Sequence, residues 1–323
     1  MQNSVFVVNK EPYCIWEMNV GERNREFLNG IDPDYFSYVA DIHLNADDEK
    51  RAAIALRSDF HHALETLFSL IGSYVQAPDC AYAWIAKCSN NQLRKFVADV
   101  SCHRNSLFTK LNIDNVAWSE ISRSVFSGYL PNTEKNGRTV SLFAELWGKL
   151  ADEFLNDAHI DEYNSIKHGF RVRSGGFSLT IGLEHKYGVS PPQDEMKCIG
   201  HSEHGTTIIK LEKISSNKDE RSYRSKRHSL NWSVKKTALL LQLVSMSINN
   251  ITSALKISNG VEASTCKFTR PLEDGDFAAP WGYSTGVTSI DMDYILPFDN
   301  SMNTNKEQLQ KQVDNYVQSK VNK

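Results

Sequence analysis

Tyr163-Asn164-Ser165-Ile166-Lys167-His168-Gly169 marks the point where the chain changes from helical to extended periodicity. Asn164 and His168 are four residues apart, so they would share one face of a helix. Gly169 is the residue type that most often follows the end of a helix. The next residues, Phe170-Arg171-Val172-Arg173, alternate apolar and basic side chains as the start of a strand does. The stretch predicts a helix, a stop and a strand.

Before this junction the apolar residues recur mostly at helical spacing. A long helix is expected from about residue 47 to Ala77, because Pro78 cannot continue it. Further helices are expected over about 79–85, 93–100 and 143–155. Another large helix should run from about Ser229 to Ser258, where Asn259-Gly260 ends it.

Extended segments are expected in four places. Val5–Val8 and Phe36–Leu44 have strand-like composition, and Phe177–Leu183 alternates after the turn residues Gly175-Gly176. Thr206–Ile214 would pair with the 177–183 strand across a long loop. The predicted fold is mainly α: a helical bundle with a small antiparallel β insertion, α+β overall.

These patterns divide the chain into three predicted segments. Residues 1–46 form a mixed N-terminal segment, and residues 47–260 form the bundle, interrupted by a β-hairpin insertion at about 170–228. Residues 261–323 are rich in Gly, Pro and Asp before a weakly amphipathic tail helix around 309–321.

Composition restricts the class of protein. The chain has 323 residues, 41% of them hydrophobic, and a net charge of −3, which does not suggest a general nucleic-acid coat protein. Its six cysteines have no CxxC spacing and indicate reduced thiols. No signal peptide is recognisable and the longest apolar run is too short for a membrane span. We therefore expect a cytoplasmic protein that has no membrane contact and needs no cofactor.

The junction resembles the signature of the HEPN superfamily, helical proteins that include many bacterial defence and toxin ribonucleases. That signature is an arginine, a polar residue that is often asparagine, three further residues and a histidine. Asn164 and His168 occupy the polar and histidine positions, whereas Tyr163 stands in place of the arginine. The resemblance implies a protein that binds or cleaves RNA without a metal ion, in antiphage defence or as a toxin, and works as a homodimer.

The resemblance gives the junction residues specific roles. His168 would act as a general acid or base. Asn164 would orient the phosphate or the imidazole, and Arg171 and Arg173 would contact phosphate oxygens. Because Tyr163 replaces the arginine, a non-catalytic HEPN-like interaction or sensor module that binds a partner protein is the alternative. A plain structural role for Asn164 and His168 at the helix end also remains open.

A basic segment follows the predicted hairpin. Residues 218–227 contain five basic and two acidic side chains, and Tyr223 lies among them. Basic groups beside an aromatic ring can hold a nucleic-acid backbone and stack a base. The segment is expected to be a surface loop, and its candidate RNA contacts are four side chains: Arg221, Arg224, Lys226 and Arg227. An ordinary basic surface loop without RNA contacts is the alternative.

Two weaker patterns suggest metal chemistry. Cys198, His201 and His204 are ligand types that suit zinc and lie close in sequence. His61 and Glu65 share a helical face and could contribute to a site between helices. A metalloenzyme is therefore a further alternative, although a polar loop and a surface contact explain the same residues.

Overall fold

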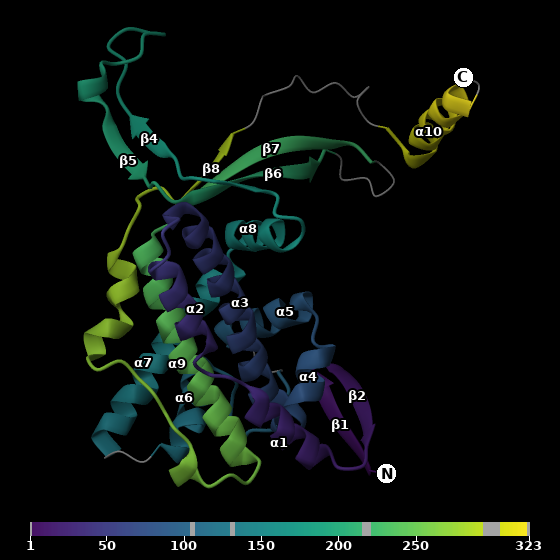
Figure 1. Ribbon diagram of the computed structural model, residues 1–323, viewed down its shortest axis with the longest axis vertical. Coiled ribbons are helices and arrows are strands. Elements are labelled where there is room, and N and C mark those ends of the chain that lie inside the picture. Colours follow the sequence, from purple (N-terminus) through teal and green to yellow (C-terminus); the bar gives the residue numbers. More distant parts are fainter. Residues whose placement is uncertain (1, 104–106, 130–132, 215–220, 293–303, 322–323) are drawn as a thin grey trace. The chain divides into compact units, whose positions relative to one another are not determined.

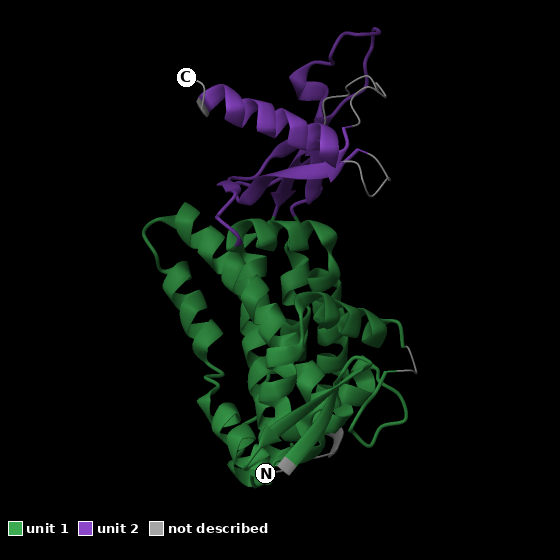
Figure 2. Ribbon diagram, turned by 90° about the vertical axis from the view of Figure 1, so that its right-hand side faces the viewer, with its two compact units in different colours: residues 1–167, 232–284 green, residues 168–231, 285–323 purple. Residues whose placement is uncertain are grey.

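The computed structural model describes residues 2–103, 107–129, 133–214, 221–292 and 304–321. The chain forms two compact units, each built from two stretches of sequence (Figure 2). Unit 1 consists of residues 1–167 and 232–284, and unit 2 consists of residues 168–231 and 285–323. The β-containing insertion is thus joined by the C-terminal residues, while the N-terminal segment and residues 261–284 belong with the helices.

Unit 1 is mainly helical, with one β-hairpin near the N-terminus (Figure 1). The hairpin is formed by β1 (Gln2–Val8) and β2 (Glu11–Glu17), which pair antiparallel. The α-helices are α1 (Val20–Gly30), α2 (Tyr35–Leu44), α3 (Glu49–Gln76), α4 (Ala81–Lys87), α5 (Asn90–Ser101), α6 (Trp118–Val125), α7 (Thr133–Leu155), α8 (Asp157–Lys167) and α9 (Val234–Ser258). Short 3-10 turns lie at Pro78–Cys80, Phe126–Gly128, Ala263–Thr265, Asp274–Phe277 and Ala279–Gly282.

The centre of unit 1 is the packing of α3 against α9, with α2 against both. The helical spacing of apolar residues along α3 places one stripe in the core: Leu56, Phe60, Leu64, Leu67 and Ile71 are each at most 1% exposed. Asp48 begins α3 by accepting a hydrogen bond from Arg51 N, and Pro78 follows its end. The predicted long helix is confirmed.

By length and composition α9 could cross a membrane. However, 78% of its most apolar 18-residue window is buried within the chain, which is the behaviour of a core helix. The predicted end of this helix is confirmed, because α9 stops at Ser258 and Gly260 adopts a φ of 88°. Its predicted start is wrong, since Ser233 caps the helix and residues 223–231 are a strand.

One strand predicted in unit 1 is a helix. Residues 36–44, predicted as a strand, are helical in α2, where Phe36 and Ala40 are buried one turn apart. Strand-like residue types were overruled here by packing against neighbouring helices. α7 and α8 are separated at Asn156, whose Oδ1 accepts a hydrogen bond from Ala158 N.

Unit 2 contains a four-stranded antiparallel sheet in the order β3-β6-β7-β8. Its strands are β3 (Val172–Ser174), β6 (Gly205–Lys213), β7 (Tyr223–Asn231) and β8 (Ser289–Met292). A separate pair is formed by β4 (Ser178–Ile181) and β5 (Lys197–His201), joined through a 3-10 turn at Gln193–Glu195. The predicted tail helix is confirmed as α10 (Lys306–Val321).

Strand pairing in unit 2 differs from the prediction. β6 does not pair with β4 but with β3 and β7, and β7 covers the second half of the predicted basic segment. β7 was missed because charged side chains fill its first half, where alternation with apolar residues is absent. The mainly helical α+β fold is therefore confirmed, while its sheet is larger than a hairpin.

Candidate nucleic-acid interface

The helix-to-strand junction has the predicted order of elements but a shorter helix. α8 ends at Lys167, so His168 lies just beyond the last helical residue. Gly169 and Phe170 both adopt positive φ, 100° and 50°, and turn the chain before β3 begins at Val172. The predicted stop at glycine is confirmed. His168 is exposed to solvent and therefore accessible to a ligand, whereas Asn164 is half-buried in α8.

Tyr163, the residue at the arginine position of the signature, is buried in unit 1. Its hydroxyl lies 3.2 Å from a carboxylate oxygen of Glu65, to which it donates a hydrogen bond. Burial and the Glu65 charge raise the pKa of the Tyr163 phenol. The Lys167 ammonium lies 5.3 Å from the centre of the Tyr163 ring and 3.5 Å from Glu65. Tyr163 is thus a packing residue and cannot reach a phosphate in place of the arginine.

The four-stranded sheet of unit 2 has two faces of different character. Side chains of directly paired residues lie on the same face, and successive residues alternate. On one face Glu212 accepts hydrogen bonds from Arg224 (3.0 Å) and Lys226 (3.2 Å). Asp291 on β8 lies 2.9 Å from Lys226 and 2.5 Å from His228. Arg224 and Lys226 on this face are therefore paired with carboxylates.

The opposite face combines large apolar side chains with basic ones. Ile209, Leu211, Tyr223 and Met292 are 72%, 70%, 49% and 49% exposed. We call this surface the apolar-basic face and define it by seven of the residues that the register places there: Arg173, Ile209, Leu211, Lys213, Tyr223, Arg227 and Met292. The outward positions of β3, β6, β7 and β8 on this side include no aspartate or glutamate.

The predicted RNA contacts are only partly brought together. Arg173 and Arg227 share the apolar-basic face, although they come from segments 54 residues apart in the chain. Arg224 and Lys226 lie on the opposite face, which corrects their grouping with Arg227. Arg171 precedes β3, and Arg221 precedes β7, where its backbone N–H donates to Thr304 O. Residues 218–220 of the predicted basic segment lie outside the described residues.

In the described part of the chain no group of three or more His, Cys, Asp or Glu side chains is arranged to hold a metal ion. Cys198 lies on β5 and contacts Ser178 and the Gly200 carbonyl. The structure does not gather Cys198, His201 and His204 as a set of zinc ligands. It does not gather His61 and Glu65 in such a set either, and His61 Nε2 donates to Glu162 instead.

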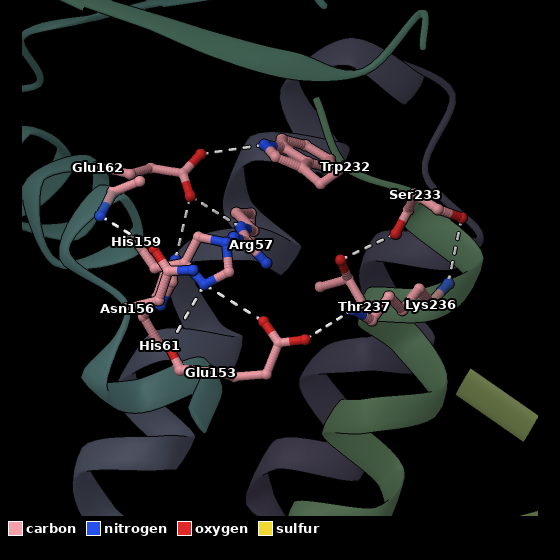
Figure 3. A network of polar contacts seen from close by, with 11 residues as sticks. Arg57, His61, Glu153, Asn156, His159, Glu162, Trp232, Ser233, Lys236 and Thr237 are labelled. Atoms are coloured by element: carbon pink, nitrogen blue, oxygen red, sulfur yellow. Dashed lines mark hydrogen bonds and ion pairs between the residues drawn. The ribbon is translucent and has the colours of Figure 1, made fainter. Parts of the chain in front are cut away.

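A second polar cluster, missed by the sequence analysis, is buried in unit 1 (Figure 3). Glu162 on α8 is completely buried and accepts three hydrogen bonds: from Arg57 Nε at 2.9 Å, from Trp232 Nε1 at 3.0 Å and from His61 Nε2 at 3.3 Å. The Arg57 guanidinium also lies over the rings of Phe60 and Trp232, 5.6 and 5.7 Å from their centres. One carboxylate thus joins α3, α8 and the start of the α9 segment.

Glu153 forms the other half of this buried cluster. It lies 2.6 Å from Lys236 Nζ and 3.2 Å from His159 Nδ1. Burial opposes its ionisation, but His159 and Lys236 outweigh that effect and hold the pKa of Glu153 well below its ordinary value. His61 is different: burial and the neighbouring Arg57 charge lower the pKa of its imidazole to about 4. The cluster therefore contains two carboxylates and a neutral His61.

α3 also contains the residue order of the signature, at a place that the sequence analysis did not single out. Arg57, Ser58 and His62 follow it with the correct spacing. His62 is exposed, but the Arg57 side chain is only 4% exposed and is paired with Glu162. Arg57 cannot contact a nucleic-acid phosphate in this arrangement. Its pattern could have been found by searching for the motif, but its burial could not.

The apolar-basic face and the exposed His168 are therefore the described features best placed to meet an external ligand. Comparisons of the chain with protein-family models, with curated proteins and with solved structures found no match.

Proposed function

We propose that the protein binds single-stranded RNA on the apolar-basic face of unit 2. The observation that carries this proposal is an exposed sheet surface that combines an aromatic ring and aliphatic side chains with cations and has no carboxylate of its own. Bases of a single strand stack on such side chains, while the phosphates seek positive charge. An exposed apolar patch on a sheet otherwise has a solvation cost that a partner would relieve.

The two arginines of this face are available for phosphates. Neither Arg173 nor Arg227 has a carboxylate within 4.0 Å among the residues that the structure describes. Two strand spacings and a two-residue offset separate their backbone positions by roughly 12 Å. Tyr223 and Leu211 lie further along the same face. A strand of RNA could therefore cross the sheet with its backbone on the arginines and a base on Tyr223.

The wider proposal is that the chain is a divergent HEPN-like protein, with unit 1 as its helical bundle. The support is the Asn164–His168 spacing, the exposed imidazole and the predominance of helices in unit 1. Cleavage would use His168 as the acid or base. Tyr163 is buried and cannot take the role of the signature arginine. Arg171, which is exposed three residues after His168, would contact the phosphate instead.

Replacing Tyr223 with alanine is the direct test of binding. Stacking of one base contributes about 1–3 kcal/mol, so the dissociation constant for a single-stranded oligonucleotide should rise about 5- to 150-fold. Fluorescence anisotropy with a labelled uridine-rich 12-mer at fixed salt would measure it. Arg227→Gln should weaken binding and reduce the slope of log affinity against log salt by about 0.7, the effect of one phosphate contact.

Arg224→Gln is the matched control, because Arg224 also lies on β7 and is exposed, but on the face where Glu212 neutralises it. Its affinity should stay within about twofold of wild type. Equal losses for Arg224→Gln and Arg227→Gln would show that overall charge, and not this face, attracts the RNA. Unchanged affinity in Tyr223→Ala would remove the proposal.

Cleavage of RNA is tested separately from binding, by the length of the oligonucleotide after incubation. If His168 is catalytic, wild-type protein in the presence of a chelator should shorten the oligonucleotide and His168→Ala should leave it intact. Binding by His168→Ala should be unchanged, because His168 is not on the apolar-basic face. Binding without cleavage by both proteins would identify the non-catalytic module, and sedimentation of the wild type would test the homodimer.

A further inference from the structure

A cavity of about 340 Å³ lies in unit 1 between α9 and the segments that precede α2 and follow α9. This volume is at the lower end of the range for small-molecule sites. Polar side chains dominate its lining, with Pro33 and Val261 as apolar exceptions. From α9 it receives Asn249, Thr252, Ser253 and Lys256.

One wall of the cavity is held in place by hydrogen bonds between α9 and the segment that follows it. Asn249 Nδ2 and Ser253 Oγ both donate to the carbonyl of Lys267, each at 2.8 Å. Asn250 holds the next part of the same segment, donating to Thr269 O and accepting from Thr269 N, both at 2.7 Å. Lys267 and Thr269 are thus fixed along α9, and Thr265 and Cys266 line the cavity beside them.

Two features of the lining point to a polar, negatively charged ligand. Lys256 and Lys267 line the cavity, and neither ammonium has a carboxylate within 4.0 Å in the described part of the chain. Thr252 is 3% exposed, and its hydroxyl has no hydrogen-bond partner among the described residues. Buried hydroxyl groups are normally satisfied, so Thr252 is an unsatisfied polar group in the cavity wall.

One acidic side chain also lines the cavity. Asp34 precedes α2, and its carboxylate makes no side-chain cap to that helix. A ligand that satisfied both lysines and Asp34 would carry an anionic group and, at another position, hydroxyl or amino donors. A phosphorylated small molecule with free hydroxyl groups has this distribution, and two ammonium groups match one phosphate.

We propose that this cavity binds a small phosphorylated molecule of the size of a nucleoside monophosphate, with Lys256 and Lys267 contacting the phosphate and Asp34 accepting from the hydroxyl groups. The site lies wholly in unit 1 and is independent of the sheet surface proposed for RNA. It therefore stands or fails separately from that function.

Cys266 provides a readout inside the cavity. It lines the wall and is half-buried, whereas Cys14 on β2 is exposed and outside the cavity. Alkylation of the full-length protein by iodoacetamide, followed residue by residue by mass spectrometry, would report occupancy. With 5 mM AMP as the probe, the rate at Cys266 should fall at least about fivefold, and the rate at Cys14 should not change.

Variants and analogues make the test specific. Lys256→Gln should abolish the protection by AMP, while Lys235→Gln, an exposed lysine of α9 away from the cavity, should retain it. Inorganic phosphate should protect in part. Equal protection by adenosine and AMP would refute a phosphate site, as would an unchanged Cys266 rate across AMP, GMP, CMP and UMP.

Discussion

Replacing Glu162 with alanine is expected to lower the free energy of unfolding by about 3–5 kcal/mol, the cost of leaving a buried charge without its partner. Glu162 is completely buried and is the acceptor for Arg57, which is itself 3% exposed. Without the carboxylate, the guanidinium and the Trp232 N–H would both lose their buried hydrogen bonds. One of the Arg57 amino groups, Nη2, already has no partner among the described residues.

Urea unfolding followed by circular dichroism would measure this loss as a lower midpoint with an unchanged slope. Glu212→Ala is the matched control, because Glu212 also receives two cations but lies at the surface of the sheet. Surface ion pairs contribute about 0–1 kcal/mol, so this variant should unfold close to the wild-type midpoint.

The double variant Arg57→Met/Glu162→Leu separates the contribution of the buried ion pair to stability from the contribution of side-chain packing. Replacing a buried ion pair by apolar side chains of similar volume is often neutral or stabilising. The double variant should therefore recover most of the stability lost in Glu162→Ala. A loss as large as that of the single variant would mean that Glu162 acts through packing instead of charge compensation.

The helices of unit 1 could be predicted where the pattern of apolar residues within one segment is enough to show which face is buried. Residues 49–76 and 234–258 carry apolar stripes long enough that only a helix buries them. Phe36–Leu44 could not be predicted in the same way, because its aromatic and β-branched residues are typical of strands. Its helical form depends on burying Phe36 and Ala40 against elements distant in sequence.

The candidate surface was predictable only in part for a similar reason. Arg173 and Arg227 were both recognised as basic groups, but their common face depends on the register of three strands. Arg224 and Lys226 show the converse, because Glu212 and Asp291 neutralise them from neighbouring strands. Composition gives the charges of a segment, whereas pairing between distant strands decides which charges stay available.

The buried cluster could not be predicted from the sequence, because Arg57 and Glu162 are 105 residues apart and only the fold brings them together.

His61 in this cluster makes the stability of the protein depend on pH. Its native pKa is about 4, because burial and Arg57 disfavour its charged form, while an unfolded histidine has a pKa near 6.5. As the pH falls from about 6.5 to 4, His61 binds a proton in the unfolded chain but stays neutral in the native state. Stability contributed by neutral His61 is therefore complete above pH 6.5 and is lost below it, by about 3 kcal/mol in total.

His61→Gln isolates this contribution, because glutamine can still donate to Glu162 but does not titrate. The free energy of unfolding of the wild type, measured in urea at pH 7, 6 and 5, should fall more steeply than that of the variant. The difference should grow toward about 1.4 kcal/mol per pH unit, the value for one proton. Glu153 has its pKa held low, so its contribution is lost mainly below its ordinary pKa of 4.5 and in both proteins alike. Parallel curves between pH 7 and 5 would contradict the prediction, because they would show that native and unfolded His61 bind protons alike.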